Sequence, residues 1–342
     1  MSINLECLYY EIKKHIDKVD FSKLWRGFEP LKFALYTENE CFFDGKYIPK
    51  TDEFLGNTSI CYNNEVIAIW NVMEQTDSIV LASKMIHEMF HGFQLINNES
   101  RFPNELDALY EYKYTDQNLS LKFEENVIIS ELLDNFEFDK FQKLLKIRKF
   151  RASNYSYEYH YETCVEQIEG AAQFVELCAL KQLSYDTYLD KLNKLKSRIT
   201  INGNLLPVRI ISYDVGALLL LILNENGIEY QSGFVNTPFS EYLIANMSEC
   251  ELNVELSMGA TINSYYENAD LIISKAIESN DVVNEGLFDL LGVNVYNAIY
   301  RNGFIISRYF VMYGDKNCPK VEYGDFVIET PEYMKVSKIY RI

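Results

Sequence analysis

The spacing of hydrophobic residues predicts a helix, then strands, then a second helix in the N-terminal part of the chain. Apolar side chains recur at helical intervals over residues 3–19. Over residues 33–73 the period falls toward two between turn signals, and Glu65–Asn71 is the clearest strand. Helical spacing returns over residues 78–97. We therefore expect a small antiparallel sheet at about 33–73, followed by a long helix at about 78–97.

The remaining two thirds of the chain are expected to be mostly helical at first and mixed later. Further helices are predicted at residues 104–114, 119–151, 157–183 and 214–223. Beyond residue 230 strands are predicted at 303–313 and 320–340, around Gly-Asp turns. The prediction is an α+β chain, mostly helical, with one domain over residues 1–230. Residues 231–342 form a region of unknown role, which can belong to the same domain.

The charge of the chain argues against a polyanionic partner. Asp and Glu number 50 and Lys and Arg 32 in 342 residues, so the formal net charge is −18. Such a chain repels phosphate, and we expect neither nucleic acid nor an anionic membrane as its partner. A basic cluster at residues 140–151 is expected to be an ordinary solvated helix face.

Several sequence features indicate a soluble protein of a reducing compartment, the cytoplasm. The longest apolar run, Val215–Leu223, is too short to cross a bilayer, and the N-terminal residues lack the pattern of a signal peptide. The 7 cysteines contain no Cys-x-x-Cys pair, which argues against a zinc ribbon or a thioredoxin-like site.

Residues 87–91 read His-Glu-Met-Phe-His, an HExxH pattern inside the helix predicted at 78–97. Positions four apart lie on one helix face, so His87 and His91 can both reach one zinc ion at about 2 Å. Glu88 is rotated by one residue from that face and suits a general base acting on water at the metal. The chain has only 4 His, and two of them stand at this spacing. The alternative is a histidine pair on an ordinary helix with a solvated Glu88.

A catalytic zinc ion takes a third protein ligand and keeps one position open. The metzincin pattern requires glycine and histidine at positions 94 and 97, where this chain has Gln94 and Asn97. That class is excluded, and carboxylates remain as the candidates.

The helix predicted at 157–183 carries a stripe of glutamates beside an apolar face. At about 100° per residue, Glu169 lies at the border of the apolar face, while Glu166 points outward. Small residues at 170–172 allow another helix to approach closely at this level. We favour Glu169 as the third ligand. For Glu162 and Glu166 a solvated acidic face is an equal alternative.

These motifs together resemble those of the gluzincin metallopeptidases. In that group HExxH is followed far downstream by Glu-Gly-x-Ala-x-aromatic, which matches Glu169 and the residues through Phe174. A later Tyr-x-x-Gly-Ala element matches Tyr213–Ala217. The resemblance covers roughly residues 60–225 and is closest to poorly characterised bacterial members. It implies a zincin-like fold, Glu169 as the third zinc ligand, and an edge strand along the cleft, for which Glu65–Asn71 is in the right place. The alternative is that Glu65–Asn71 is an internal structural strand.

Two further residues are candidates for the catalytic machinery. Tyr213 can donate a hydrogen bond to a tetrahedral intermediate, although simple packing is as good an interpretation. His160 can stabilise an oxyanion or can be a surface histidine. The acids Glu105, Asp107 and Glu111 can pair with the histidine rings or belong to a helix surface.

The functional hypothesis is a zinc-dependent metallopeptidase with Zn²⁺ as its cofactor and a peptide or protein as its substrate. Glu88 acts as the general base, and His87, His91 and Glu169 bind the metal. One alternative is a regulatory or binding protein that keeps a zincin scaffold and holds metal without turnover. The presence of Glu88 argues against that alternative, since a scaffold needs no base. A metal-free helical protein is a third possibility.

Overall fold

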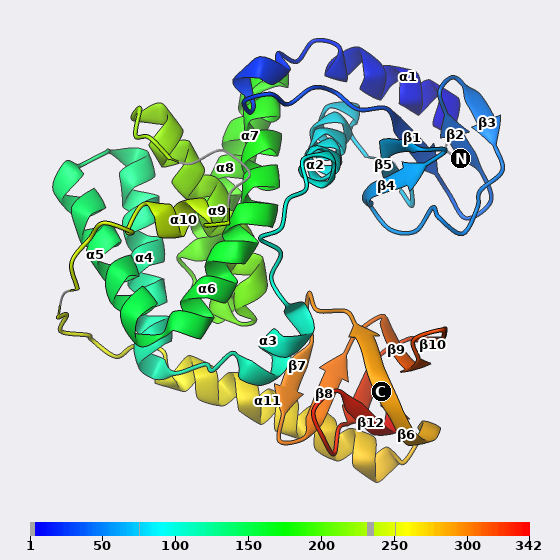
Figure 1. Cartoon of the computed structure of the whole chain (residues 1–342), viewed down its shortest axis with the longest axis vertical. Coiled ribbons are helices and arrows are strands. Elements are labelled where there is room, and N and C mark those ends of the chain that lie inside the picture. Colours follow the sequence, from blue (N-terminus) through cyan, green and yellow to red (C-terminus); the bar gives the residue numbers. More distant parts are fainter. Residues whose placement is uncertain (1–3, 75, 231–235, 250) are drawn as a thin grey trace.

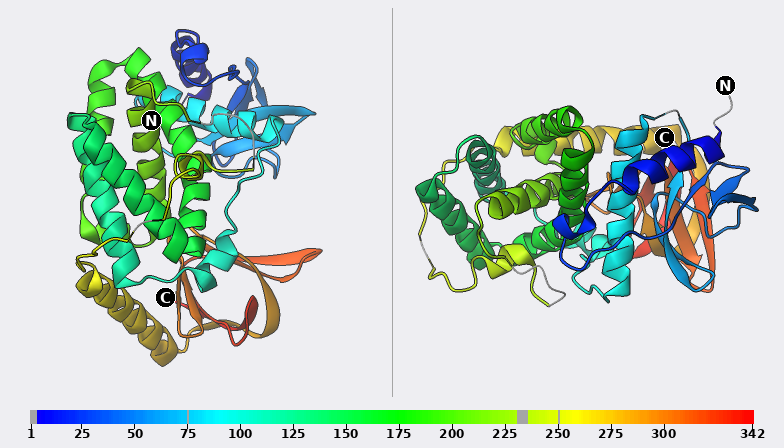
Figure 2. Two further views of the ribbon diagram at one scale, coloured as in Figure 1. Left: turned by 60° about the vertical axis from the view of Figure 1, so that its left-hand side comes forward. Right: turned by 90° about the horizontal axis from the view of Figure 1, so that it is seen from above.

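The structure is a computed structural model, and it describes residues 4–74, 76–230, 236–249 and 251–342. Its architecture is α+β, as expected, with helices and two sheets. Figure 1 and Figure 2 show both sheets on the same side of a central helical bundle. No helix within the described ranges combines the length and the hydrophobicity needed to cross a membrane.

The N-terminal part contains the first sheet and the helix that carries the HExxH residues. Its elements are α1 (Leu5–Ile16), a 3-10 turn (Phe21–Lys23), β1 (Phe33–Tyr36), β2 (Cys41–Phe43), β3 (Lys46–Ile48), β4 (Thr58–Tyr62), β5 (Glu65–Asn71) and α2 (Ser78–Ile96). The predicted strand Glu65–Asn71 and the predicted helix at 78–97 are confirmed. The Asp77 side chain caps α2 by accepting hydrogen bonds from the backbone N–H groups of Ile79 and Val80.

The expectation of an antiparallel first sheet is wrong in one pairing. The strand order is β3-β2-β1-β5-β4, and β1 runs parallel to β5 with Phe33 opposite Ala68. Parallel neighbours need a long connection, which the chain provides through the β2–β3 hairpin and β4. As a result β5 (Glu65–Asn71) is an internal strand, and the edge strands of the sheet are β3 and β4.

The alternation of side chains along β5 gives the first sheet two different faces. Ala68 and Trp70 point toward the main core, which also contains residues of α1 and α2. Ile67 and Ile69 point to a small second cluster with Tyr36 and Phe54. The α2 helix therefore packs on the face of the sheet that presents Trp70.

The central part of the chain is a helical bundle. Its elements are α3 (Glu105–Glu111), α4 (Asp116–Asp134), α5 (Phe138–Asn154), α6 (Ser156–Val165), α7 (Ala171–Leu183), α8 (Tyr185–Ile199), a 3-10 turn (Asn202–Leu205), α9 (Val208–Glu225) and the short α10 (Phe239–Tyr242). The single helix expected at 119–151 is in fact two helices, because the backbone of Asn135 is extended and ends α4.

The helix predicted at 157–183 is present from Ser156 to Leu183, with a π turn at Glu166–Gly170 joining α6 and α7. The backbone N–H of Ala171 donates to the carbonyl of Glu166, five residues back. This turn contains one residue more than an α-helical turn does. The faces before and after it are therefore not related by a uniform 100° step.

Glu162, before the π turn, and Glu166, its first residue, belong to a fully buried charge network. Glu162 accepts from Tyr112 and pairs with Lys122 at 2.9 Å, and Arg148 binds Glu166 at 2.8 Å. Arg151 pairs with Glu125 at 3.1 Å as well as with Glu162. The prediction that Glu166 points outward is wrong, and so is a solvated acidic face for Glu162 and Glu166. The prediction of a solvated face at 140–151 is correct for Lys143 and Lys146, which are exposed. It is wrong for Arg148 and Arg151, which are buried.

The C-terminal part consists of a long helix and the second sheet. Its elements are α11 (Gly259–Ser279), β6 (Val282–Val293), β7 (Ile299–Arg301), β8 (Phe304–Ser307), β9 (Phe310–Asp315), β10 (Cys318–Tyr323), β11 (Phe326–Glu329) and β12 (Lys335–Arg341), with the sheet order β10-β9-β6-β12-β11-β8-β7. Strands within 303–313 and 320–340 are confirmed, but Gly314 and Asp315, one of the expected turns, belong to β9. The elements α11 and β6 were not predicted. Leu106, Leu109 and Tyr110 of α3 pack against the core of this sheet. The domain boundary expected at 230/231 stays a prediction, since residues 231–235 lie outside the described residues.

Candidate metal centre

The α2 helix and the π turn bring the three predicted metal ligands together. His87 and His91 are one helical turn apart on α2, and their Nε2 atoms face each other at 3.1 Å. Oε2 of Glu169 lies 3.4 Å from Nε2 of His91 and 4.0 Å from Nε2 of His87. One donor atom from each residue falls within a cluster no wider than 4.8 Å.

These separations fit a tetrahedral metal ion. Bonds of about 2.0–2.1 Å to a tetrahedral zinc ion place neighbouring donor atoms about 3.3 Å apart. The separations of 3.1, 3.4 and 4.0 Å lie around that value. The chemistry of the donors, two imidazole nitrogens and one carboxylate oxygen, is that of a catalytic zinc site.

The Gln94 side chain fixes the orientation of the His91 ring. Nε2 of Gln94 donates to the backbone carbonyl of Ile168 at 3.0 Å, so its Oε1 must face the other way. That oxygen lies 2.8 Å from Nδ1 of His91, which therefore carries the proton. In the neutral form of His91 that binds a metal ion, the lone pair on Nε2 is then directed at Glu169 and His87.

A buried carboxylate plays the corresponding role for His87. Oε2 of Glu176 lies 3.4 Å from Nδ1 of His87, and Lys191 pairs with the other oxygen of Glu176. Burial alone would raise the pKa of Glu176, but Lys191 and His87 outweigh it and lower this pKa to about 2. The ionised Glu176 favours the His87 tautomer that has its proton on Nδ1 and its lone pair on Nε2.

The cluster attracts positive charge. Burial would raise the pKa of Glu169, but His91 and Arg209 lower it to about 2. Burial would lower the pKa of His91, but the carboxylate of Glu169 raises it to about 9. The attraction of Glu169 for a cation therefore exceeds the penalty of burial at this position.

Glu88 is a buried carboxylate beside the two histidines. It is only 8% exposed, and burial raises its pKa, although His87 and His91 oppose this. Ser59 of β4 donates to the backbone carbonyl of Glu88 at 2.6 Å and ties α2 to the sheet. In the described part of the chain no side chain pairs with the Glu88 carboxylate, which lines the cleft. It is therefore available to water there.

The cluster opens into a cleft of about 840 Å³. One wall is formed by β4, β5 and α2, with Thr58, Trp70 and Lys84. The bundle forms a second wall, and the loop after β6 adds Asn294, Val295 and Tyr296 as a third. The C-terminal part of the chain therefore contributes directly to the walls of the cleft.

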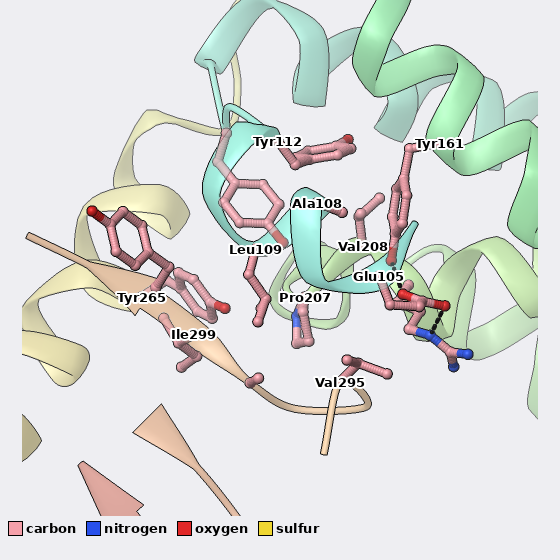
Figure 3. A pocket seen from close by; sticks show the side chains of 14 residues that line it. Glu105, Ala108, Leu109, Tyr112, Tyr161, Pro207, Val208, Tyr265, Val295 and Ile299 are labelled. Carbon is pink, nitrogen blue, oxygen red and sulfur yellow. Dashed lines mark hydrogen bonds and ion pairs between the residues drawn. The ribbon is translucent and has the colours of Figure 1, made fainter. Parts of the chain in front are cut away.

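Tyr213 lies in the cleft wall and is held there by Arg209. The guanidinium of Arg209 donates to the Tyr213 hydroxyl, contacts Glu169 at 3.4 Å, and bonds Glu105 at 2.7 Å. Tyr161 donates to the same Glu105 carboxylate at 2.7 Å. Figure 3 shows the side chains of Tyr161 and Glu105 meeting in the lining of a small pocket. The volume of this pocket is about 40 Å³, and it shares Glu105, Arg209 and Val295 with the lining of the cleft. Tyr296 packs edge-on against Tyr213, with the ring centroids 5.8 Å apart.

His160 does not lie with the other candidates. Its ring is largely exposed, faces Glu241 at 2.7 Å, and does not line the cleft. Glu105 lines the cleft but contacts Arg209 instead of a histidine, and Asp107 and Glu111 lie outside the cleft. Glu176 and Gln94 occupy the position next to the histidines that these acids were expected to fill.

The small residues expected near Glu169 do permit a close helix contact, but the partner is α9. A Cβ atom on Gly170 would lie 2.7 Å from the Cα atom of Gly216. Gly216 belongs to the Tyr-x-x-Gly-Ala element, whose Tyr213 stands one turn earlier in the cleft wall. The contact thus positions Tyr213 relative to Glu169.

Four residues of the site were not predicted in these roles. Glu176 follows Glu169 by two turns, a spacing that marks a shared helix face. Gln94 follows His91 by three residues and shares its face as well. For Arg209 and Tyr296 the sequence carries no comparable signal, because their positions depend on how α9 and the second sheet pack.

No family model, no curated protein and no solved structure matches this chain.

Proposed function

We propose that this protein is a zinc-dependent metallopeptidase that hydrolyses peptide bonds in the cleft around His87, His91 and Glu169. The observation that carries the proposal is the convergence of two imidazole nitrogens and one carboxylate oxygen within 4.8 Å. The likeness of the sequence motifs to gluzincins supports the same activity. The proposal extends to the fold, which is then zincin-like around β4, β5, α2 and the helix that carries Glu169.

When bound, zinc supplies Lewis acidity, which polarises a carbonyl group and makes water acidic near neutral pH. The side chains of the chain perform the remaining steps. Glu88 accepts a proton from the attacking water and returns it to the amine that leaves, so that the proton count balances. Gln94 and Glu176 keep the two histidines in the tautomers that present Nε2 to the centre.

Tyr213 suits the role of a hydrogen-bond donor to the carbonyl oxygen of the substrate. Its hydroxyl oxygen accepts from Arg209, which leaves its own proton directed elsewhere. A donor held in place before the reaction stabilises negative charge as it develops on that oxygen. Arg209 acts through Tyr213 and is a positioning residue.

The experiment compares metal content with hydrolysis in matched variants. Glu88→Gln should keep about one zinc per chain and lose peptide hydrolysis by about 10²-fold or more, because only the base is removed. Glu169→Ala should lose zinc. Glu38→Gln, which removes an exposed carboxylate far along the chain from the motif, should change neither quantity. Zinc is measured by elemental analysis of protein purified without chelator or affinity metal.

Each outcome separates one class of function from the others. Hydrolysis by Glu88→Gln at the wild-type rate would overturn the assignment of the base. Stoichiometric zinc without cleavage of any member of a broad peptide library would favour a binding protein that holds metal without turnover. A wild-type protein without bound metal, and unable to bind zinc on titration, would overturn the proposal as a whole.

A further inference from the structure

A lysine and a tryptophan lie side by side in the cleft wall, one helical turn from the metal cluster. Lys84 of α2 precedes His87 by three residues and lines the cleft. Its Nζ atom lies 5.4 Å from the centre of the Trp70 ring, and Trp70 is the next-to-last residue of strand β5. Trp70 also lines the cleft and projects from the face of the first sheet that packs on α2.

The charge of Lys84 is not balanced by a neighbouring acid. Arg209, the other cationic residue in the cleft wall, bonds Glu105 at 2.7 Å and contacts Glu169 at 3.4 Å. In the described ranges of the chain no carboxylate, that of Glu88 included, lies within 4.0 Å of Nζ of Lys84. The ring of Trp70 attracts the ammonium group through its quadrupole but does not neutralise it. Among the described residues of the cleft wall, Lys84 therefore offers a positive charge that is free to pair with a ligand.

The position of Lys84 relates this charge to the reacting bond. Three residues along a helix correspond to about 4.5 Å. One residue of an extended peptide spans about 3.3 Å. An ammonium group on a flexible four-carbon stem at Lys84 therefore reaches a substrate group one to two residues from the bond at the centre. The Trp70 ring beside it offers a flat apolar surface for the methylene groups of that residue.

From these contacts we infer that Lys84 and Trp70 form a subsite for a carboxylate group of the substrate, next to the scissile bond. The inference rests on the proposed peptidase function and specifies its substrate class. The carboxylate belongs either to an Asp or Glu side chain or to the C-terminus of the peptide. Both present the same chemistry to an ammonium group.

The test uses pairs of peptides that differ only in charge. One series carries Glu or Gln at single positions of an amidated peptide, and the other carries a free or an amidated C-terminus on a neutral peptide. Binding to zinc-loaded Glu88→Gln protein is measured by calorimetry, and kcat/KM is measured with the wild type. We expect the member with the carboxylate to be preferred about tenfold or more in one series, which identifies the source. Added salt should weaken the preference.

Substitutions assign the preference to Lys84. Lys84→Met should abolish it, Lys84→Arg should retain most of it, and Trp70→Leu should reduce it. Lys46→Met removes the same charge from the exposed strand β3 and should leave the preference unchanged. Bound zinc, measured in every variant, shows that the centre is intact.

The outcomes distinguish this inference from the proposed function. Hydrolysis with equal kcat/KM for charged and neutral peptides, or a preference that persists in Lys84→Met, would overturn the subsite and leave the peptidase in place. Selective binding of carboxylate peptides that depends on Lys84, in a protein that hydrolyses none of them, would support the subsite and count against the peptidase.

Discussion

Nδ1 of His91 and Oε1 of Gln94 lie 2.8 Å apart on α2, and this contact decides which nitrogen of His91 faces Glu169. Gln94 is itself held by the carbonyl of Ile168, which precedes Glu169 in the π turn. A single side chain thus connects the orientation of one ligand with the backbone next to another.

We expect Gln94→Leu to weaken zinc binding by about 10- to 100-fold, because His91 loses the acceptor that selects its tautomer. Gln94→Glu keeps an oxygen acceptor at this position and should recover most of the affinity. Competition with a chromophoric chelator measures the dissociation constant. Equal affinities for wild type and Gln94→Leu would show that His91 is oriented by other contacts.

Removing the Tyr213 hydroxyl should slow the reaction without removing zinc. We expect Tyr213→Phe to lower kcat about 10²-fold with little change in KM, because the lost hydrogen bond forms in the transition state. Tyr296→Phe removes a hydroxyl from the ring that packs against Tyr213 and serves as the matched control. Steady-state kinetics and zinc analysis provide the measurement. Equal kcat values for Tyr213→Phe and Tyr296→Phe would contradict the role of Tyr213.

The close contact between Gly170 and Gly216 makes a prediction for stability. A methyl group on Gly170 would lie 2.7 Å from the Gly216 Cα atom, so we expect Gly170→Ala to lower the free energy of unfolding by about 1–3 kcal/mol. Helix propensity alone would favour alanine by about 1 kcal/mol. The sign of the measured change in the free energy of unfolding therefore shows whether the steric clash or the helix propensity is larger. Gly203→Ala is the control, because its Cβ would meet nothing within 4 Å. Urea unfolding monitored by circular dichroism provides the comparison.

The buried charge network should make the fold sensitive to acid. Burial alone would raise the pKa of Glu162, but Arg151 and Lys122 lower it from 4.5 to about 2. Because this pKa is lower in the folded state, the ionised form stabilises the protein above pH 4.5. That contribution is lost as the pH falls from 4.5 toward 2. Urea unfolding at several pH values should show the decline.

Glu162→Gln tests whether this carboxylate contributes to the decline. The variant should be less stable at pH 7, because it leaves buried cations without their full set of partners. It should also lose less stability than the wild type between pH 4.5 and 2. A parallel decline in both proteins would place the acid sensitivity in other carboxylates.

The parts of the fold that local patterns govern could be predicted from the sequence. The helix Ser78–Ile96 and the strand Glu65–Asn71 have clear periods and turn or capping residues at their ends. HExxH placed His87 and His91 on one face for the same reason. Glu169 was correctly predicted as the carboxylate that approaches them. That prediction assumed a uniform rotation of about 100° per residue, which the π turn interrupts.

The errors arise where the packing of distant segments decides the outcome. The parallel pairing of β1 with β5 depends on the path of the connection between them, which no local pattern specifies. The burial of Glu166 depends on cations from α4 and α5, and hydrophobic periodicity treats all glutamates as polar. The role of Arg209 depends on contacts with α3 and the π turn.

The π turn at Glu166–Gly170 also restricts changes in the length of this helix. Glu162 and Glu166, before the turn and at its first position, are paired with the bundle, while Glu169 and Glu176, at its fourth position and after it, face the histidines. Deleting one residue here would restore a regular helix and rotate one side by about 100° relative to the other. Either set of contacts could then form, but not both, so this segment tolerates substitutions more readily than insertions or deletions.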